Sequence, residues 1–427
     1  MSREKIILGE DCIYEKNGDI NQNVLVCGSS GCGKTMSVLE PRLLETVDTS
    51  LIITISKRRL VKQYTELFLN RGYQVYDLNF IHPEESNVAY DPLAYIKNTS
   101  DIVYLAQAIA NMETRKAGSK ADPYWDQCAV SLLSAEIGLV MLKINHPTFS
   151  DVLKLHDMLQ ITEADGTIQT TIDGNFEKLS ECENDALSGF VQNAWRTFRQ
   201  VPIRTASCIF STLNATLDTI FTPELRKMMD HAQKVDFEKI ANEKSLLFIS
   251  VSAVNPALNQ FVNLFYAQSI KQLFEYAETH ADGILPVPVH MLCDDFACGS
   301  RILNFPEYIS IFREKGISVT LLLQSESQLS AMYEEDATTI INNCDTYLYM
   351  GGMDLKTCIN VSTRLNIPLD EVLYMPVGKV VVFRRGERPV VTNRYNIEAD
   401  RRYQDVTRKY RMKLNREREV KERLTFE

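Results

Sequence analysis

The sequence contains no stretch of about 18 consecutive apolar residues, which is the length that a helix needs to cross a bilayer. It also contains no pattern typical of a secretory signal peptide. The longest apolar segment, Val130 to Ile144, is interrupted by two serines, a glutamate and a lysine. We therefore expect a buried core helix in this segment, and a protein that works in the cytoplasm.

Motifs for structural metals and disulfides are also lacking. Histidine is scarce, with 6 residues, and the 10 cysteines show neither a C-x-x-C spacing nor a paired histidine pattern. Several cysteines lie in apolar segments, among them Cys27, Cys208 and Cys293. This placement is typical of reduced, buried thiols and argues against a zinc or disulfide framework.

The chain has no overall excess of positive charge. It carries 46 basic and 56 acidic residues, for a net charge of −10, which excludes a wholly basic DNA-coating protein. Any contact with nucleic acid must therefore be local. With 45% hydrophobic and 24% charged residues over 427 positions, the composition predicts a soluble globular protein with more than one domain.

Positive charge is concentrated at the end of the sequence. Between Arg401 and Leu424 there are ten basic residues against four acidic ones. The pattern predicts a basic helical extension over residues 401–427. Two interpretations stay open for it: a solvated surface helix, or a contact with nucleic acid, anionic lipid or a protein partner.

One motif organises the chain. Residues 28–35 read Gly-Ser-Ser-Gly-Cys-Gly-Lys-Thr and match G-x-x-x-x-G-K-[ST], between an apolar segment, Val24 to Cys27, and a helical pattern. Glycines let such a loop approach a polyphosphate closely, and its backbone N–H groups point inward. The alternative is a glycine turn that caps an ordinary helix. The predicted nucleotide-binding residues are Gly28, Ser29, Ser30, Gly31, Cys32, Gly33, Lys34 and Thr35.

Apolar segments alternate with helical patterns on both sides of a long helical stretch. Apolar runs at 51–55 and 74–78 flank a helical pattern at 59–70, which predicts a parallel βαβ unit. Further strands are predicted at 246–251, 287–293, 317–323, 346–350 and 379–383. We therefore expect an α/β domain over residues 1–95 and 196–400, and an all-helical insertion over residues 96–195.

A second acidic element is required to hold Mg²⁺ near the phosphates. The segment His290 to Phe296 is an apolar run that ends in two acids. We assign Asp294, together with the Thr35 hydroxyl, to the metal and Asp295 to the base that activates water. An aspartate is one methylene shorter than a glutamate, so the reach of Asp295 to the water is limited.

Two further side chains are candidates for the γ-phosphate, beside Lys34. Arg313 lies on a predicted helix between the acidic strand and the next strand, and it could be donated to the site of a neighbouring subunit. The alternative for Arg313 is a surface ion pair with Glu307 or Glu314. Gln324 ends the following strand, where a γ-phosphate sensor would lie.

The order of short motifs resembles that of the conjugative coupling proteins of type IV secretion systems, over roughly residues 23 to 385. The motifs are Val-Cys-Gly-Ser-Ser-Gly-Cys-Gly-Lys-Thr, Tyr90-Asp-Pro-Leu93, Asp122-Pro-Tyr-Trp125, Cys-Asp294-Asp295-Phe-Ala297, Arg313-Glu-Lys-Gly-Ile-Ser-Val-Thr-Leu-Leu-Leu-Gln324-Ser, and Asn343-Cys-Asp345.

The resemblance implies a RecA-like P-loop ATPase with an inserted all-helical domain, assembled as a hexameric ring. It implies ATP and Mg²⁺ as cofactors, and DNA, a relaxase and other secretion components as partners. It also supports the roles given above to residues 28–35, Asp294, Asp295, Arg313 and Gln324.

Three departures from the family pattern matter. The usual D-P-K-G element is replaced by Ile55-Ser56-Lys57-Arg58, so that only the lysine remains. The catalytic acid is Asp295 in place of the usual glutamate. Most members begin with membrane helices, whereas this sequence begins about two dozen residues before the phosphate loop. We therefore expect either a soluble variant or docking onto a separate membrane anchor protein at the inner face of the membrane.

Two functions remain open from the sequence. The first is a ring ATPase that couples ATP hydrolysis to DNA transfer. The second is an adaptor that binds nucleotide for stability and presents secretion substrates without pumping. A guanine-reading N-K-x-D motif is absent, which together with the resemblance favours ATP over GTP.

Overall fold

The computed structural model describes residues 4–15, 20–110, 123–164, 167–181, 186–252, 255–296, 298 and 300–425. A nine-stranded sheet runs through its centre in the order β13-β12-β11-β3-β10-β9-β4-β8-β5. The strands are β3 (Val24–Cys27), β4 (Ser50–Ile55), β5 (Gln74–Asn79), β8 (Ser245–Ser250), β9 (Val289–Cys293), β10 (Ile317–Leu323), β11 (Thr346–Tyr349), β12 (Lys379–Arg384) and β13 (Val390–Asn393).

The sheet is mainly parallel. All neighbours from β11 to β5 pair in parallel, and only β12 and β13 pair antiparallel, at one edge. The central strands read as apolar runs because both of their faces are covered by helices. This arrangement confirms the predicted α/β fold class.

Alternate residues of each central strand enter two separate cores. On one face Val24, Val26 and Leu322 pack against α1 (Glu40–Glu45), α2 (Arg59–Asn70) and β1 (Lys5–Gly9). On the other face Leu25 and Leu323 pack against α11 (Pro256–Glu278), α12 (Phe305–Lys315), α13 (Glu326–Tyr333) and α14 (Asp336–Asn342). Successive side chains of each strand therefore point to opposite faces, as in any β-strand. The sequence does not show this alternation because the residues on both faces are apolar.

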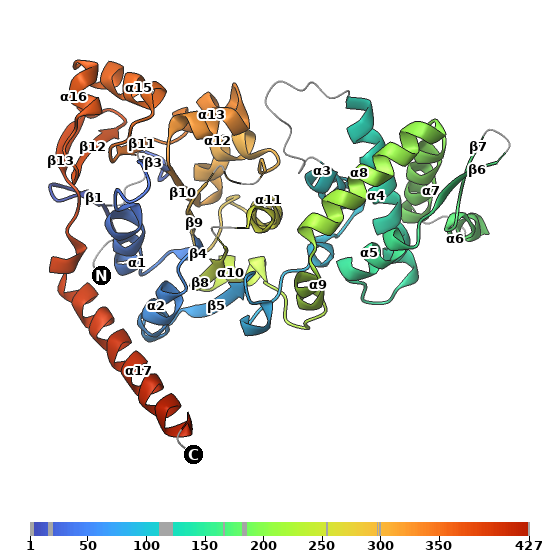
Figure 1. Cartoon of the computed structure of the whole chain (residues 1–427), viewed down its shortest axis with the longest axis horizontal. Helices are drawn as coiled ribbons and strands as arrows, with labels where there is room; N and C mark the ends of the chain where they lie inside the picture. Colours follow the sequence, from blue (N-terminus) through green and yellow to red (C-terminus); the bar gives the residue numbers. More distant parts are fainter. Residues whose placement is uncertain are drawn as a thin grey trace.

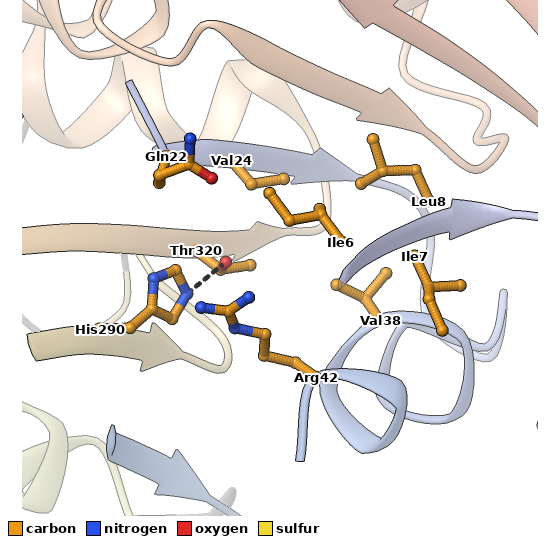
Figure 2. Close-up of a pocket in the computed structure, with 9 residues that line it drawn as sticks. All are labelled: Ile6, Ile7, Leu8, Gln22, Val24, Val38, Arg42, His290 and Thr320. Atoms are coloured by element: carbon orange, nitrogen blue, oxygen red, sulfur yellow. Dashed lines mark hydrogen bonds between the residues drawn. The ribbon is translucent and has the colours of Figure 1, made fainter. Parts of the chain in front are cut away.

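A small cavity of about 20 Å³ lies beneath the first helix after β3, and Figure 2 shows the polar groups that close it. His290 bonds to Ser318 Oγ at 2.7 Å through Nδ1 and to Thr320 Oγ1 at 2.9 Å through Nε2, which ties β9 to β10. The Arg42 guanidinium of α1 is directed toward them and pairs with Glu4 at 3.7 Å. These buried contacts fix the helix against the strands.

Pro41 does not break the helix after β3. It lies in the first turn of α1, where a missing N–H is tolerated. The preceding residues, Thr35–Leu39, form a π-helical turn, so the interruption takes the form of a change in helix type.

The helical body on the right of Figure 1 lies beside the sheet. It contains α3 (Thr99–Ala110), α4 (Pro123–Lys143), α5 (Phe149–Asp157), α6 (Asp173–Glu177), α7 (Ala186–Arg199), α8 (Ile203–Ile220), α9 (Pro223–Met229) and a hairpin of β6 (Ile161–Ala164) and β7 (Thr167–Thr170).

The expected end of this domain at residue 195 falls inside α7. Helix α8 packs against α3 and α4, and α9 packs against α5. We therefore propose that the helical domain continues to Met229. Its β6–β7 hairpin departs from the expected all-helical composition. The sequence analysis missed this hairpin because four-residue strands are too short to give a recognisable pattern.

Among the described residues, Tyr124–Lys143 is the one helix long and apolar enough to cross a membrane, and 56% of its most apolar window is buried within the protein. It packs most closely against α7, as the expected core helix would. Cys27 and Cys293 are buried as predicted, but the prediction for Cys208 is wrong. Cys208 lies on the exposed face of α8, whose apolar positions 206 and 209 face inward instead.

The basic tail forms α17 (Arg401–Thr425), which extends away from the body toward the C-terminus in Figure 1. Tyr403 and Val406 anchor its start in the core beside α2. Lys409 pairs with Glu66 at 2.9 Å, and both side chains are largely exposed.

Candidate functional site

The phosphate loop leaves the sheet at the carboxyl edge of its parallel strands. Leu323, the last residue of β10, pairs with Cys27, the last residue of β3. The Gly28 N–H then donates to the Leu323 carbonyl at 3.1 Å. Ligands of open α/β sheets bind at this edge, so the loop is where a nucleotide site is expected.

The loop needs glycine at three positions. Gly31 and Gly33 have φ values of +80° and +94°, a region that side-chain-bearing residues rarely adopt. A Cβ on Gly28 would lie 2.7 Å from Cys32 Sγ and 2.9 Å from Met350 Cβ. The N–H of Ser29 donates to the Gly351 carbonyl at 2.9 Å, which holds the start of the loop against the segment after β11.

The Lys34 side chain folds back over the start of the phosphate loop. Its Nζ donates to the carbonyl oxygens of Gly28 at 2.6 Å and Ser29 at 3.3 Å. Thr35 begins the π-helical turn immediately after it. The positive charge of the lysine and the N-terminus of the helix therefore lie together at the mouth of the loop, which suits a polyanion.

The two acids reach the same edge from β9. Cys293, the last residue of β9, pairs with Leu321 of β10 and with Thr54 of β4. Asp294 and Asp295 follow directly. Because β10 alone separates β3 from β9, the strands that lead into the loop and into the acids are about 10 Å apart.

Opposing influences act on the pKa of Asp294. Burial raises the pKa of its carboxyl to about 6, with a further contribution from the negative charge of Asp295. The positive charges of Lys34 and Lys57 act in the opposite direction and lower that pKa. The half-buried carboxylate thus lies where an additional cation would be favourable.

Asp295 has a left-handed backbone conformation, with φ +50°. The chain then turns back, and the Phe296 N–H donates to the Leu322 carbonyl at 3.0 Å. The buried Phe296 ring packs against Phe305 and Tyr333, which fixes the turn. Aspartate tolerates this region better than most residues, and that gives a physical reason for the short acid.

The loop after β4, which departs from the family pattern, contains one lysine that acts on the site, Lys57, and two arginines with structural contacts, Arg58 and Arg59. Arg58 pairs with Asp77 at 2.6 Å and donates to Ser250 Oγ at 2.9 Å. Arg59 pairs at 2.5 Å with the buried Glu40. The sequence left the role of Lys57 open; in the structure it is exposed, and its charge reaches Asp294.

Gln324 lies beside the loop, but Arg313 does not. Gln324 follows β10, at the level of Gly28, and is exposed. Arg313 is also exposed but lies near the end of α12, before β10 begins. The seven residues of β10 span about 20 Å. Arg313 lies near the start of this strand, whereas the phosphate loop of the same chain lies near its end.

The oxygen donors of the site fit Mg²⁺ held jointly with a nucleotide. The described residues contain no group of three or more His, Cys, Asp or Glu side chains that could hold a metal alone. Mg²⁺ in nucleotide sites takes one or two protein oxygens together with phosphate oxygens and water. A hydroxyl at Thr35 and a half-buried carboxylate at Asp294 are donors of that kind.

Sequence reasoning missed two segments that enclose the loop. One is Gly351–Gly352, one residue after the end of β11, whose adjacent glycines could have indicated a close approach. The other follows β13, where Arg394 Nη1 donates to the Cys32 carbonyl at 3.3 Å. Nothing local to Arg394 in the sequence indicates that contact, because 362 residues separate it from Cys32.

Known structures share this fold. The bacterial conjugative coupling protein TrwBdeltaN70 in complex with sulphate is 14% identical, with a TM-score of 0.63 over 92% of this chain and 90% of that chain. The plasmid coupling protein TrwB in complex with ADP and Mg²⁺ is 15% identical, with a TM-score of 0.65 over the same shares. VirB4 of Thermoanaerobacter pseudethanolicus is 13% identical, with a TM-score of 0.51 over 93% and 97%.

At these identities the likeness establishes the fold alone, which is that of RecA-like P-loop proteins. No curated protein matched the sequence. The model of a family described as Type IV secretory system Conjugative DNA transfer matches residues 2–365, which is most of the chain and confirms the resemblance stated above. This chain therefore belongs to the conjugative DNA-transfer family of type IV secretion systems.

Proposed function

We propose that this protein is an ATP-dependent coupling protein of a conjugative type IV secretion system, which recruits relaxase-bound DNA and drives its transfer by ATP hydrolysis. The observation that carries the proposal is the placement of the Gly28–Thr35 loop and the Asp294–Asp295 pair at one sheet edge, with β10 alone between their strands. Family membership supplies the DNA-transfer context.

Each residue of the site has a distinct task in this proposal. The loop amides and Lys34 bind and orient the phosphates, and Thr35 and Asp294 hold Mg²⁺, which neutralises phosphate charge when bound. Asp295 takes the proton from the attacking water. Gln324, beside Gly28, detects the γ-phosphate. The related protein TrwB has been seen with ADP and Mg²⁺ and with the ATP analogue ADPNP, which supports these ligands for the present chain.

We further propose that the protein works as a hexameric ring in the cytoplasm, at the inner face of the membrane, with a separate anchor protein and other secretion components. Arg313 lies about 20 Å from the phosphate loop of its own chain, which is too far to reach it, so in this proposal it serves the site of a neighbouring subunit. An exposed arginine at that edge is compatible with such a role.

ATP turnover with and without DNA tests this function. If DNA in a ring is the substrate of the motor, single-stranded or duplex DNA should raise turnover severalfold at low salt. The stimulation should fall as salt is added, because phosphate contacts weaken with ionic strength. Turnover that is indifferent to DNA at low salt would contradict a DNA-driven motor.

A second function, the non-pumping adaptor, is favoured by two observations. The short acid Asp295 has an unusual backbone conformation, and the loop with Lys57 has lost the other residues of the family element. An adaptor would bind nucleotide, support transfer and show no turnover with any DNA. The same measurements therefore separate the two functions.

A further inference from the structure

The segment that follows the twin acids is held by contacts at several points. At one end the Phe296 N–H bonds to β10, and at the other the Ile302 N–H donates to the Tyr333 hydroxyl at 3.0 Å. Between these ends, Cys298 and Ser300 are held by side chains that come from other helices. The path of this segment begins at the acid that we assign to water activation.

One asparagine bonds to two carbonyls of the segment. Asn263 Nδ2 donates to the Cys298 carbonyl at 2.8 Å and to the Ser300 carbonyl at 2.7 Å. An amide NH₂ group has two N–H donors, so these bonds use both of them. Because one nitrogen holds both carbonyls, the two bonds are lost together when the side chain is removed.

The helix that carries Asn263 is firmly packed. Helix α11 lies between the sheet and the helical body in Figure 1, and it packs against α3, α8 and α12. Val262 and Leu264, the neighbours of Asn263 in sequence, are buried, and so are Phe261 and Phe265. This burial fixes the rotation of the helix and gives Asn263 a defined position from which to hold the segment.

A glutamine on α13 holds the same segment. Gln328 Oε1 accepts the Gln324 N–H at 3.3 Å, and Gln328 Nε2 donates to Cys298 Sγ at 3.2 Å. A backbone N–H can only donate, so the amide oxygen faces Gln324 and the nitrogen faces the sulfur. Burial raises the pKa of the Cys298 thiol, and the negative charge of Asp295 raises it further, so the sulfur is a neutral, weak acceptor. Gln328 thus ties the strand end that carries the candidate sensor to the segment after the acids.

Asp295 needs such support because of its backbone. A residue with a side chain keeps a left-handed conformation, here φ +50°, only when its surroundings fix it. The short carboxylate must also meet its water accurately, since a displacement of about 1 Å can cost a reaction much of its rate. Contacts just beyond the turn can supply that accuracy.

We propose that Asn263 and Gln328 are positioning residues for hydrolysis, which hold the segment after Asp295 so that its carboxylate faces the attacking water. The inference rests on the proposed function, since it requires Asp295 to be the base. In that step the water oxygen bonds to the γ-phosphorus, the bond to the ADP oxygen breaks, and Asp295 takes the water proton. Neither positioning side chain needs to touch the nucleotide, because each acts through the segment that it holds. The link from Gln328 to Gln324 makes the position of the base depend on the strand end that carries the sensor.

Removal of the asparagine tests this role. In Asn263→Ala, kcat for MgATP hydrolysis should fall about tenfold, because a displaced base loses part of the roughly 10²- to 10⁴-fold that a well-placed one contributes. Affinity for MgADP should change less than about twofold, since the phosphate loop is untouched. Single-turnover hydrolysis with DNA at low salt keeps slow variants measurable. Asn193→Ala is the matched control, an asparagine at an exposed position of α7, and it should behave as wild type.

A double-mutant cycle separates positioning from a general structural role. If Asn263 acts through the base, Asn263→Ala should change kcat less than about twofold in a chain that already carries Asp295→Asn. A loss of about tenfold in both backgrounds would overturn the inference, because the effect would not pass through Asp295. A kcat for Asn263→Ala within about twofold of wild type would overturn it as well.

Gln328→Ala guards against a folding defect in Asn263→Ala, because it releases the same segment from a different helix. It should lower kcat in the wild-type chain and leave kcat unchanged beside Asp295→Asn. Asp295→Asn alone reports on the proposed function: if it keeps the wild-type kcat, the assignment of the base fails and the positioning role falls with it. If Asp295→Asn loses kcat while Asn263→Ala and Gln328→Ala do not, only the positioning role is wrong.

Discussion

Replacing Lys34 with alanine is expected to lower MgATP hydrolysis by about 100-fold or more and to abolish DNA transfer. The Lys34 ammonium lies 2.6 Å from the Gly28 carbonyl, at the mouth of the loop, where it can neutralise the charge that develops on the γ-phosphate. Nucleotide binding by calorimetry, steady-state turnover and conjugation frequency measure the three consequences.

The control for this variant is Lys227→Ala, which removes an exposed lysine from α9 in the helical domain. It should behave as wild type in all three assays. Normal transfer by Lys34→Ala without hydrolysis would instead favour the adaptor. Undiminished hydrolysis would contradict the assignment of the loop as the catalytic phosphate site.

Replacing Asp295 with asparagine is expected to lower kcat by about 100-fold or more, with MgADP affinity nearly unchanged. The reason is that the amide cannot accept the proton of the attacking water, whereas general bases contribute roughly 10²- to 10⁴-fold. Asparagine also tolerates the φ of +50° at this position, so the turn into Phe296 should survive.

Asp295→Glu is the informative companion. If the short side chain limits turnover, glutamate should raise kcat. A kcat for Asp295→Asn within about twofold of wild type would mean that another group activates the water. The split between kcat and affinity distinguishes a catalytic role from a structural one.

Much of the fold could be predicted because its signals are local. Val24–Cys27 and the loop after it form a contiguous pattern, and the parallel strands are apolar over their whole length because helices cover both faces. Because parallel strands end on the same side of a sheet, the sequence alone places Gly28, Asp294 and Gln324 near one another at the carboxyl ends of the strands. Family membership and the P-loop fold follow from the same signals.

The rest depends on contacts between residues far apart in sequence. The contact of Arg394 with the phosphate loop arises only when β12 and β13 add to the sheet beside β11. The left-handed turn at Asp295 is imposed by the packing of Phe296, and no motif encodes it. The proposed extension of the helical domain past residue 195 rests on the packing of α8 against α4, a pairing that periodicity alone does not specify.

The measurement that tests the central claim most directly is calorimetric titration of the purified chain with ADP, once with excess Mg²⁺ and once with EDTA. If the loop and Asp294 share one metal–nucleotide site, Mg²⁺ should tighten binding about tenfold or more, and Asp294→Asn should remove that gain. Equal affinities in Mg²⁺ and EDTA, or no binding heat with Mg²⁺, would contradict it.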